Sequence, residues 1–180
     1  MTEAKMDVTS HVMNRLDIST GMKFEEFRSR FEEAAPSFDA DVVERLVQRA
    51  APWEDMQAAV REMAPHALIR YVTIDAGPVM ALAGNRTQAV EYLLGNHVIA
   101  ETMFRHDPHA MLYAPLRVLL YSNAVGEAVF SIDQPSTVFG SLGIDEVTEI
   151  ALGLDDKVAA LLAFLLVVVA FPPQSGTRHG

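Results

Sequence analysis

The chain has 180 residues, half of them hydrophobic, so it is long and apolar enough to bury one full core. Its 24 acidic side chains outnumber 14 basic ones, and the net charge of −10 argues against an electropositive face for nucleic acid. It has no cysteine, which excludes disulfides, thiolate zinc sites and thiol nucleophiles.

The first part of the chain predicts a strand followed by a helix. Residues 8–18 show a broken alternation of apolar side chains, which indicates a strand with one buried face that Gly21 ends. Phe24, Phe27 and Phe31 then recur at helical spacing among charged residues, which is typical of an amphipathic helix with a buried stripe.

Residues 39–64 predict a helical hairpin. Asp39 or Asp41 caps its first helix, and Pro52 opens its second. We interpret this hairpin as an insertion into the domain.

The second half of the chain is richer in strands. Those that we expect comprise residues 68–74, 88–95, 116–122 and 127–133. The last two form a hairpin through the turn at residues 123–126. Between the second and third of these strands, Asn96 caps a short helix over residues 97–104. A final helix runs from about Asp145 to Ala170 and is weakened at Gly153.

The two ends of the chain bear on its location. Residues 1–7 lack the apolar stretch of a signal peptide, so we expect a cytoplasmic protein. The most apolar stretch, residues 158–171, has 14 residues and stops at Pro172. This is shorter than the roughly 20 residues that cross a bilayer. We interpret it as a buried helix, and the alternative is a helix at an oligomer interface or a membrane surface.

Strands that cluster in sequence favour an α+β fold over an alternating parallel one. We therefore predict a mostly antiparallel sheet covered by helices, in a single domain over residues 1–172 that contains the inserted hairpin. Residues 173–180 are expected to form a flexible C-terminal tail.

Residues 92–133 resemble the second half of domain-of-unknown-function family 302, a small α+β family of bacteria and archaea. The segment LLGNHVIAETMF is similar to the family's strand-to-helix block, with Asn96 and Ile99 in register. LYAPLRVLLYS is similar to the next block, with Pro115 in register, and VFSIDQP to the third, with one extra residue before Pro135.

Two cysteines of the family pattern are absent, because Gly95 and Leu116 stand in their places, and His97 replaces a proline. A thiol or thiolate–metal role therefore cannot operate in this chain. The resemblance implies a compact α+β sandwich, often dimeric, and it passes on no established activity.

His97, His106 and His109 lie within thirteen positions of one another. His97 falls in the first turn of the helix capped by Asn96, where the positive end of the helix dipole disfavours protonation. A neutral histidine there can act as a base or polarise a carbonyl, and Glu101, four residues on, can orient it. The alternative is a partly exposed histidine with a local hydrogen bond.

Other residues near this helix suit a ligand pocket. Tyr113 can hold a ligand carbonyl, and Met103 offers a soft apolar wall, although both residue types are also common in plain cores. We assign ligand binding to Asn96, His106, His109, Met103 and Tyr92. The histidines of the turn at 106–109 could also join His97 or Glu101 around zinc or iron.

Two main hypotheses of function result. The first is a cofactor-independent acid–base enzyme of isomerase, cyclase or lyase type, or a binding protein, that acts on an apolar carbonyl-containing small molecule. In the enzyme, His97 is the acid or base, Glu101 orients it and Tyr113 positions the substrate. The second is a non-catalytic homo-oligomeric module that associates through the final helix and the inserted hairpin, and we expect the protein to be a homodimer. A histidine-ligated metal or haem protein is a further alternative. A pocket over His97 favours the first hypothesis, and a flat apolar patch on the last helix favours the second.

Overall fold

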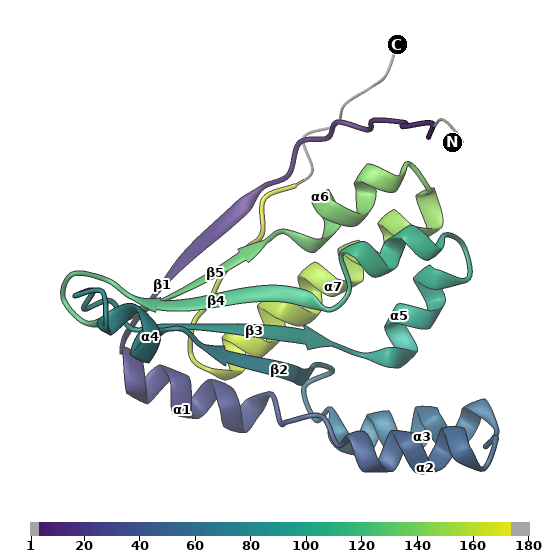
Figure 1. Ribbon diagram of the computed structural model, residues 1–180, viewed down its shortest axis with the longest axis horizontal. Coiled ribbons are helices and arrows are strands. Elements are labelled where there is room, and N and C mark those ends of the chain that lie inside the picture. Colours follow the sequence, from purple (N-terminus) through teal and green to yellow (C-terminus); the bar gives the residue numbers. More distant parts are fainter. Residues whose placement is uncertain (1–3, 174–180) are drawn as a thin grey trace.

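The structure is a computed structural model that describes residues 4–173. It contains a five-stranded antiparallel sheet with the strand order β1-β5-β4-β3-β2 (Figure 1). The strands are β1 (Arg15–Lys23), β2 (Ile69–Asp75), β3 (Ala89–Gly95), β4 (Leu116–Ser122) and β5 (Glu127–Asp133). The α-helices of the described residues are α1 (Phe24–Ala34), α2 (Ala40–Gln48), α3 (Trp53–Met63), α4 (Gly77–Ala81), α5 (His97–Phe104), α6 (Pro135–Phe139) and α7 (Asp145–Phe164). The predicted α+β class is confirmed.

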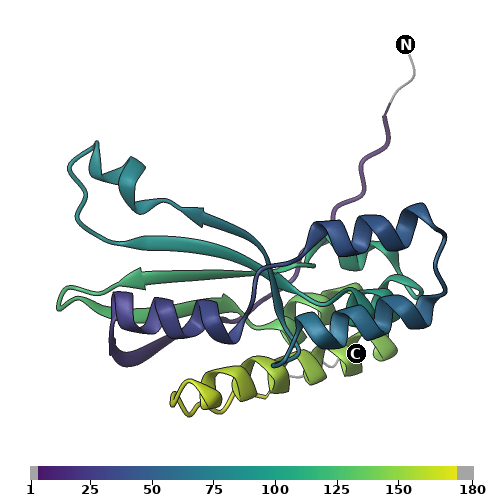
Figure 2. The same ribbon diagram turned by 90° about the horizontal axis from the view of Figure 1, so that it is seen from below.

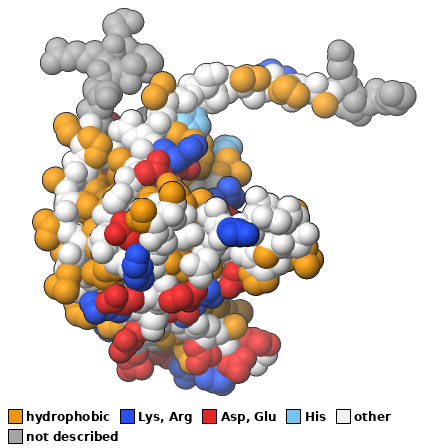
Figure 3. Space-filling model, turned by 90° about the vertical axis from the view of Figure 1, so that its left-hand side faces the viewer, with side chains coloured by type: hydrophobic (Ala, Val, Ile, Leu, Met, Phe, Trp, Pro, Cys, Tyr) orange, Lys and Arg blue, Asp and Glu red, His pale blue; other side chains and the backbone are white. Residues whose placement is uncertain are grey.

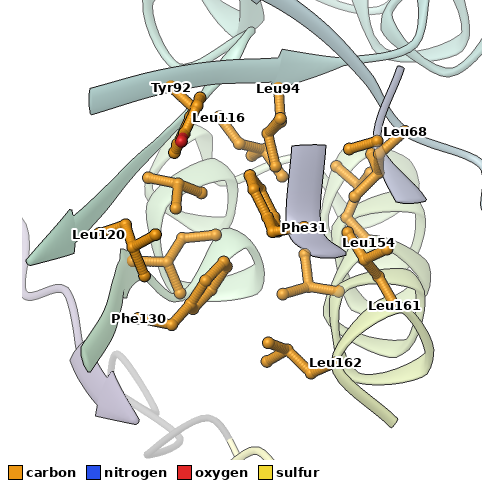
Figure 4. Packing of buried hydrophobic residues seen from close by; sticks show 14 of the residues in the cluster. Phe31, Leu68, Tyr92, Leu94, Leu116, Leu120, Phe130, Leu154, Leu161 and Leu162 are labelled. Atoms are coloured by element: carbon orange, nitrogen blue, oxygen red, sulfur yellow. The ribbon is translucent and has the colours of Figure 1, made fainter. Parts of the chain in front are cut away.

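The core lies on one face of the sheet, where α1 and α7 are both packed (Figure 2). Phe31 of α1 places its ring 5.0 Å from that of Tyr92 and 5.8 Å from that of Phe130. Leucines of α7 close the other side of this cluster (Figure 4). The phenylalanine stripe predicted from the sequence thus faces the sheet, and alternate residues of β3 and β4 meet it.

The predicted helical hairpin is formed by α2 and α3, which extend beyond one end of the sheet (Figure 1). Of the two candidate caps, Asp39 is the one that the structure uses, because its Oδ1 accepts from the Val42 amide at 3.1 Å. A small apolar cluster formed by Val60, Ala64 and Ile69 ties the hairpin to the sheet.

The first strand differs from its prediction. Val8 and Val12 are 80% and 89% exposed and precede the strand, which begins at Arg15. Gly21 does not end β1 but lies inside it with a φ of +69°, where the pairing with β5 shifts register. The glycine allows a bulge at a position that a side chain would strain, so the strand continues to Lys23.

The final helix also differs from its prediction. It is continuous through Gly153 but ends at Phe164 instead of Ala170. Leu166 has a φ of +67° and reverses the chain. Residues 165–173, which we call the C-terminal strap, follow without regular structure. Leu165 and Val167 are nevertheless buried, so this apolar stretch joins the core without extending the helix.

A buried polar network holds the C-terminal strap. Asp155 of α7 accepts from the Ser136 amide at 2.9 Å and from Nε2 of Gln134 at 2.8 Å. The same Nε2 donates to the Pro172 carbonyl at 2.8 Å, and Oε1 of Gln134 accepts from Nδ2 of Asn14 at 2.9 Å. One side chain therefore connects the segment before β1 to the strap.

Two short helices were not predicted, because α4 and α6 have five residues each and carry little periodicity. Both have a proline in their first turn, which opens a helix without losing a hydrogen bond. Within residues 4–173, no helix combines the length and apolarity that crossing a bilayer requires. The predicted tail at 173–180 lies outside the described residues from residue 174 onward.

Candidate functional site

The region around the start of α5 has the predicted cap. Oδ1 of Asn96 accepts from the amides of Val98 and Ile99 at 2.9 and 3.2 Å. Its Nδ2 donates to the Ala67 carbonyl at 2.9 Å, which fixes α5 to the segment before β2. The cap sets the helix start, and this places His97 in the first turn as predicted.

His97 belongs to a group of three aromatic side chains. Its Nδ1 lies 2.8 Å from the hydroxyl of Tyr71, which comes from β2. The ring of Phe38 lies 5.3 Å from the imidazole and 4.8 Å from the Tyr71 ring. We call Phe38, Tyr71 and His97 the aromatic triad. It joins the segment before α2, the sheet and the start of α5.

Gly95 makes the aromatic triad sterically possible. A Cβ at this position would lie 2.7 Å from Cε2 of Tyr71, closer than atoms of this kind approach. Only glycine therefore lets the tyrosine ring lie over the end of β3 and reach His97.

Burial controls the protonation of this pair. It lowers the pKa of His97, so the imidazole is neutral near neutral pH. Burial also raises the pKa of Tyr71, to about 12, while the backbone of His97 acts in the opposite sense. In the tautomer that carries its hydrogen on Nε2, His97 accepts at Nδ1 from the Tyr71 hydroxyl, which leaves Nε2–H as its free donor.

Glu101 does not orient His97. Its Oε1 accepts from Nε of Arg105 at 3.0 Å, and a second bond joins Arg105 Nη2 to Oε2. This i,i+4 pair follows from the same helical spacing that suggested a bond to His97, but the arginine competes for the carboxylate. Tyr71 supplies the hydrogen bond instead.

The two tyrosines of the sequence-based site lie elsewhere. Tyr113 packs its ring 5.8 Å from that of Phe139, and its hydroxyl accepts from Ser141 at 3.4 Å. Tyr92 is fully buried and donates to Glu32 at 2.7 Å. Met103 is 1% exposed and belongs to the main core, so it forms no pocket wall.

The turn after α5 is solvent-facing. His106 and His109 are exposed, and Nδ1 of His109 lies 2.7 Å from Oδ1 of Asp107. Over residues 4–173, no three histidine or acidic side chains are grouped as metal ligands would be. The structure therefore does not bring these histidines together with His97 or Glu101.

A pocket of about 390 Å³ lies between α3, the first turn of α5 and α7. We call it the α3–α5 pocket. Its lining comprises Gln57, Val60, Arg61, Ala64, Pro65, Ala67, Asn96, Val98, Ile99 and Lys157. His97 is not part of the lining, although the residues on both sides of it are.

A second pocket, of about 470 Å³, lies at the other end of the sheet beside α4. Its charges are balanced, since Arg28 and Arg86 lie with Glu25 and Asp75. Arg28 is already paired with Glu32 at 3.0 Å and with Asp75 at 2.9 Å. Figure 3 looks onto this end of the molecule, where side chains of both signs gather over its lower part.

Several of these groups could not be predicted from the sequence. Phe38 and Tyr71 are far from His97 in the chain and meet it only through the pairing of β2 with β3. The sequence predicts α3 only as one helix of a hairpin, and its pattern does not indicate a pocket. The available signal was Gly95, a glycine at a strand end, which often marks a close approach.

A solved structure has a similar fold. The crystal structure of an uncharacterized conserved DUF302 protein from Bacillus stearothermophilus is similar, with a TM-score of 0.57 and 16% sequence identity. The similarity covers 84% of this chain and 95% of that chain, and at this identity it shows the fold alone. No curated protein matches the sequence. The family model described as Domain of unknown function DUF302 matches residues 73–165 of the 180, so the chain belongs to this family.

Proposed function

We propose that the protein binds an apolar, carbonyl-containing small molecule in the α3–α5 pocket. The observation that carries this proposal is the pocket itself, whose volume of about 390 Å³ falls among those of small-molecule sites, roughly 300–1,000 Å³. Its walls include Val60, Ala64, Val98 and Ile99, and Gln57 can donate to a ligand carbonyl.

Binding is tested by titrating the protein with 2-octanone, an apolar ketone, and recording amide chemical shifts by NMR. We expect shifts at the pocket residues of α3 and α5. Val98→Trp fills the pocket and should abolish them. Val47→Trp makes the same change at a 70% exposed position of α2 outside the pocket and should leave them intact. Shifts that are absent, or that survive Val98→Trp, contradict the proposal.

A second candidate is acid–base catalysis on the bound carbonyl compound, and the 2.8 Å contact between Tyr71 and His97 favours it. Asn96 and Val98 line the pocket, so a bound ketone lies beside the helical turn that carries His97. In the other tautomer, which carries its hydrogen on Nδ1, His97 donates to the Tyr71 oxygen and has a lone pair on Nε2. This nitrogen can remove a proton next to a carbonyl and return it, and Tyr71 positions the imidazole.

Proton transfer is tested by incubating 2-octanone in heavy water and following loss of its α-hydrogens by NMR. A positioned base typically accelerates such a step by about 10²–10⁴-fold. We expect His97→Gln to return the exchange rate to that of buffer, and Tyr71→Phe to lower it partly. Exchange that is no faster with the wild-type protein than without it rules out this candidate and leaves ligand binding unaffected.

A further inference from the structure

The charges of the α3–α5 pocket are unlike those of the chain. Acidic residues outnumber basic ones by 24 to 14 overall, yet the pocket is lined by Arg61 and Lys157 and by no aspartate or glutamate. The pocket beside α4 instead contains two residues of each sign. The α3–α5 pocket is therefore a local positive site in an acidic protein.

Neither cation is paired with an acidic side chain within residues 4–173. In the part of the chain that the structure describes, Arg61 contacts no carboxylate. Among the described residues, the ammonium of Lys157 contacts no carboxylate and donates to the carbonyl of Gly153 at 3.4 Å. By contrast, Arg28, Arg30, Arg49, Arg105 and Arg117 all pair with acidic side chains. Charged groups left without a partner beside an apolar wall are available to a ligand.

The kind of anion follows from the donors present. The amides of Val98 and Ile99 are already bonded to the Asn96 side chain, so α5 offers no free amide cradle of the type that holds a phosphate. Its dipole still favours negative charge nearby. A guanidinium and an ammonium next to apolar side chains match a carboxylate with an apolar body.

We infer that the ligand of the α3–α5 pocket is a carboxylate-bearing apolar molecule, with its carboxylate between Arg61 and Lys157 and its apolar body against Val60, Ala64, Val98 and Ile99. This inference rests on the proposed function, because it takes the same pocket as the binding site. It goes further in naming the charge of the ligand and the two side chains that select it.

The test compares octanoate with 2-octanone, a neutral ketone with the same number of carbons, by calorimetric titration of the full chain. Charge-assisted hydrogen bonds make octanoate bind at least about tenfold more tightly at low salt. Arg61→Gln and Lys157→Gln should each remove most of this preference. Arg45→Gln, which removes an exposed cation of α2 outside the pocket, should keep it. Circular dichroism of each variant establishes that it is folded.

The outcomes separate this inference from the proposed function. If 2-octanone binds as tightly as octanoate, the carboxylate inference is overturned and ligand binding in the pocket stands. If octanoate is preferred but the preference survives both glutamine substitutions, the anion is bound elsewhere and the inference is again overturned. If neither molecule binds, the proposed function fails, and the inference fails with it.

Discussion

The hydrogen bond between Tyr71 and His97 joins two residues that are 26 positions apart and makes burial of the imidazole tolerable. A neutral histidine needs a partner for Nδ1 when water is excluded, and the tyrosine hydroxyl is one. The pair is thus a structural contact as well as a chemical one, and its protonation affects the stability of the whole fold.

Stability should therefore depend on pH through His97. Its pKa is lowered in the folded protein from an ordinary value of 6.5, so the unfolded chain binds the proton more readily. The free energy of unfolding is then highest above pH 6.5 and falls as the pH drops below it. Urea denaturation at a series of pH values measures this slope. His97→Gln should flatten it, and an unchanged slope in the variant would assign the effect to other groups.

A substitution at Gly95 tests the packing of the aromatic triad. In Gly95→Ala the new methyl lies 2.7 Å from the Tyr71 ring, which must move away from His97. We expect a loss of roughly 1–3 kcal/mol in the free energy of unfolding, typical of overpacking. Gly153→Ala is the matched control, because nothing lies within 4 Å of its added Cβ in α7. That variant should gain about 0.5–1 kcal/mol, and a Gly95→Ala protein of wild-type stability would contradict the packing described.

At the level of single residues, local chemistry was predictable and distant contacts were not. The Asn96 cap follows from the residue type and the three positions after it, so the sequence predicts both the helix start and the place of His97. Arg105 lay at the right spacing to capture Glu101, but the sequence pattern does not rank two partners of one carboxylate. Tyr71 lies at a register shift between Arg70 and Val72 and packs against Gly95, and the sequence pattern shows neither feature.

Among the elements, α7 and the C-terminal strap depend on each other. The helix ends where the chain reverses at Leu166, and the strap returns apolar side chains to the core. Asp155 of α7 is 6% exposed and receives three hydrogen bonds from α6 and the residue before it. A buried carboxylate of this kind is stable only while all of its donors are present.

Asp155→Asn should therefore destabilise the protein by roughly 1–3 kcal/mol, because an amide nitrogen would face the Ser136 or Gln134 donors. The free energy of unfolding in urea measures the loss. Asp156→Asn makes the same change at the next position, which is exposed, and should stay within about 0.5 kcal/mol of the wild type. Equal effects of the two substitutions would show that the buried network contributes little.

Periodicity predicted most elements correctly because their apolar faces are local properties. The helical stripe of α1, the alternation of β3 and β4 and the hairpin turn between β4 and β5 all persist in the structure. The end of α7 was missed because a run of apolar residues looks the same whether it continues a helix or folds back over the core. Only the positive φ of Leu166 separates the two, and an apolar leucine gives no signal of it.

For the whole molecule, the net charge of −10 implies repulsion between like charges over the surface. In most of the ion pairs of the described residues at least one side chain is exposed, and such pairs contribute little. We therefore expect screening of the repulsion to outweigh screening of the pairs. Raising sodium chloride from about 10 to about 200 mM should increase Tm by roughly 2–4 °C, which corresponds to about 1 kcal/mol. Differential scanning calorimetry measures this, and a fall in Tm would show that the ion pairs dominate.

The α3–α5 pocket is formed partly by residues inside the family match and partly by residues outside it. Its α5 and α7 walls lie within residues 73–165, which the family model matches, whereas α3 lies outside them. Arg61 comes from the part outside the match and Lys157 from the part inside. Substitutions in the α2–α3 hairpin can therefore change the lining of the pocket while the sheet and its core stay as they are.

The side chain of Gln134 bonds both to Asn14 and to the carbonyl of Pro172, so the segment before β1 and the C-terminal strap meet at one residue. Chain ends that are this close can be joined by a short peptide, and the exposed turn between β4 and β5 offers a place to open the chain. The topology thus suits circular permutation. A permuted protein would have its new termini at that turn, at the opposite end of β5 from Gln134, and both the aromatic triad and the α3–α5 pocket would keep their covalent surroundings.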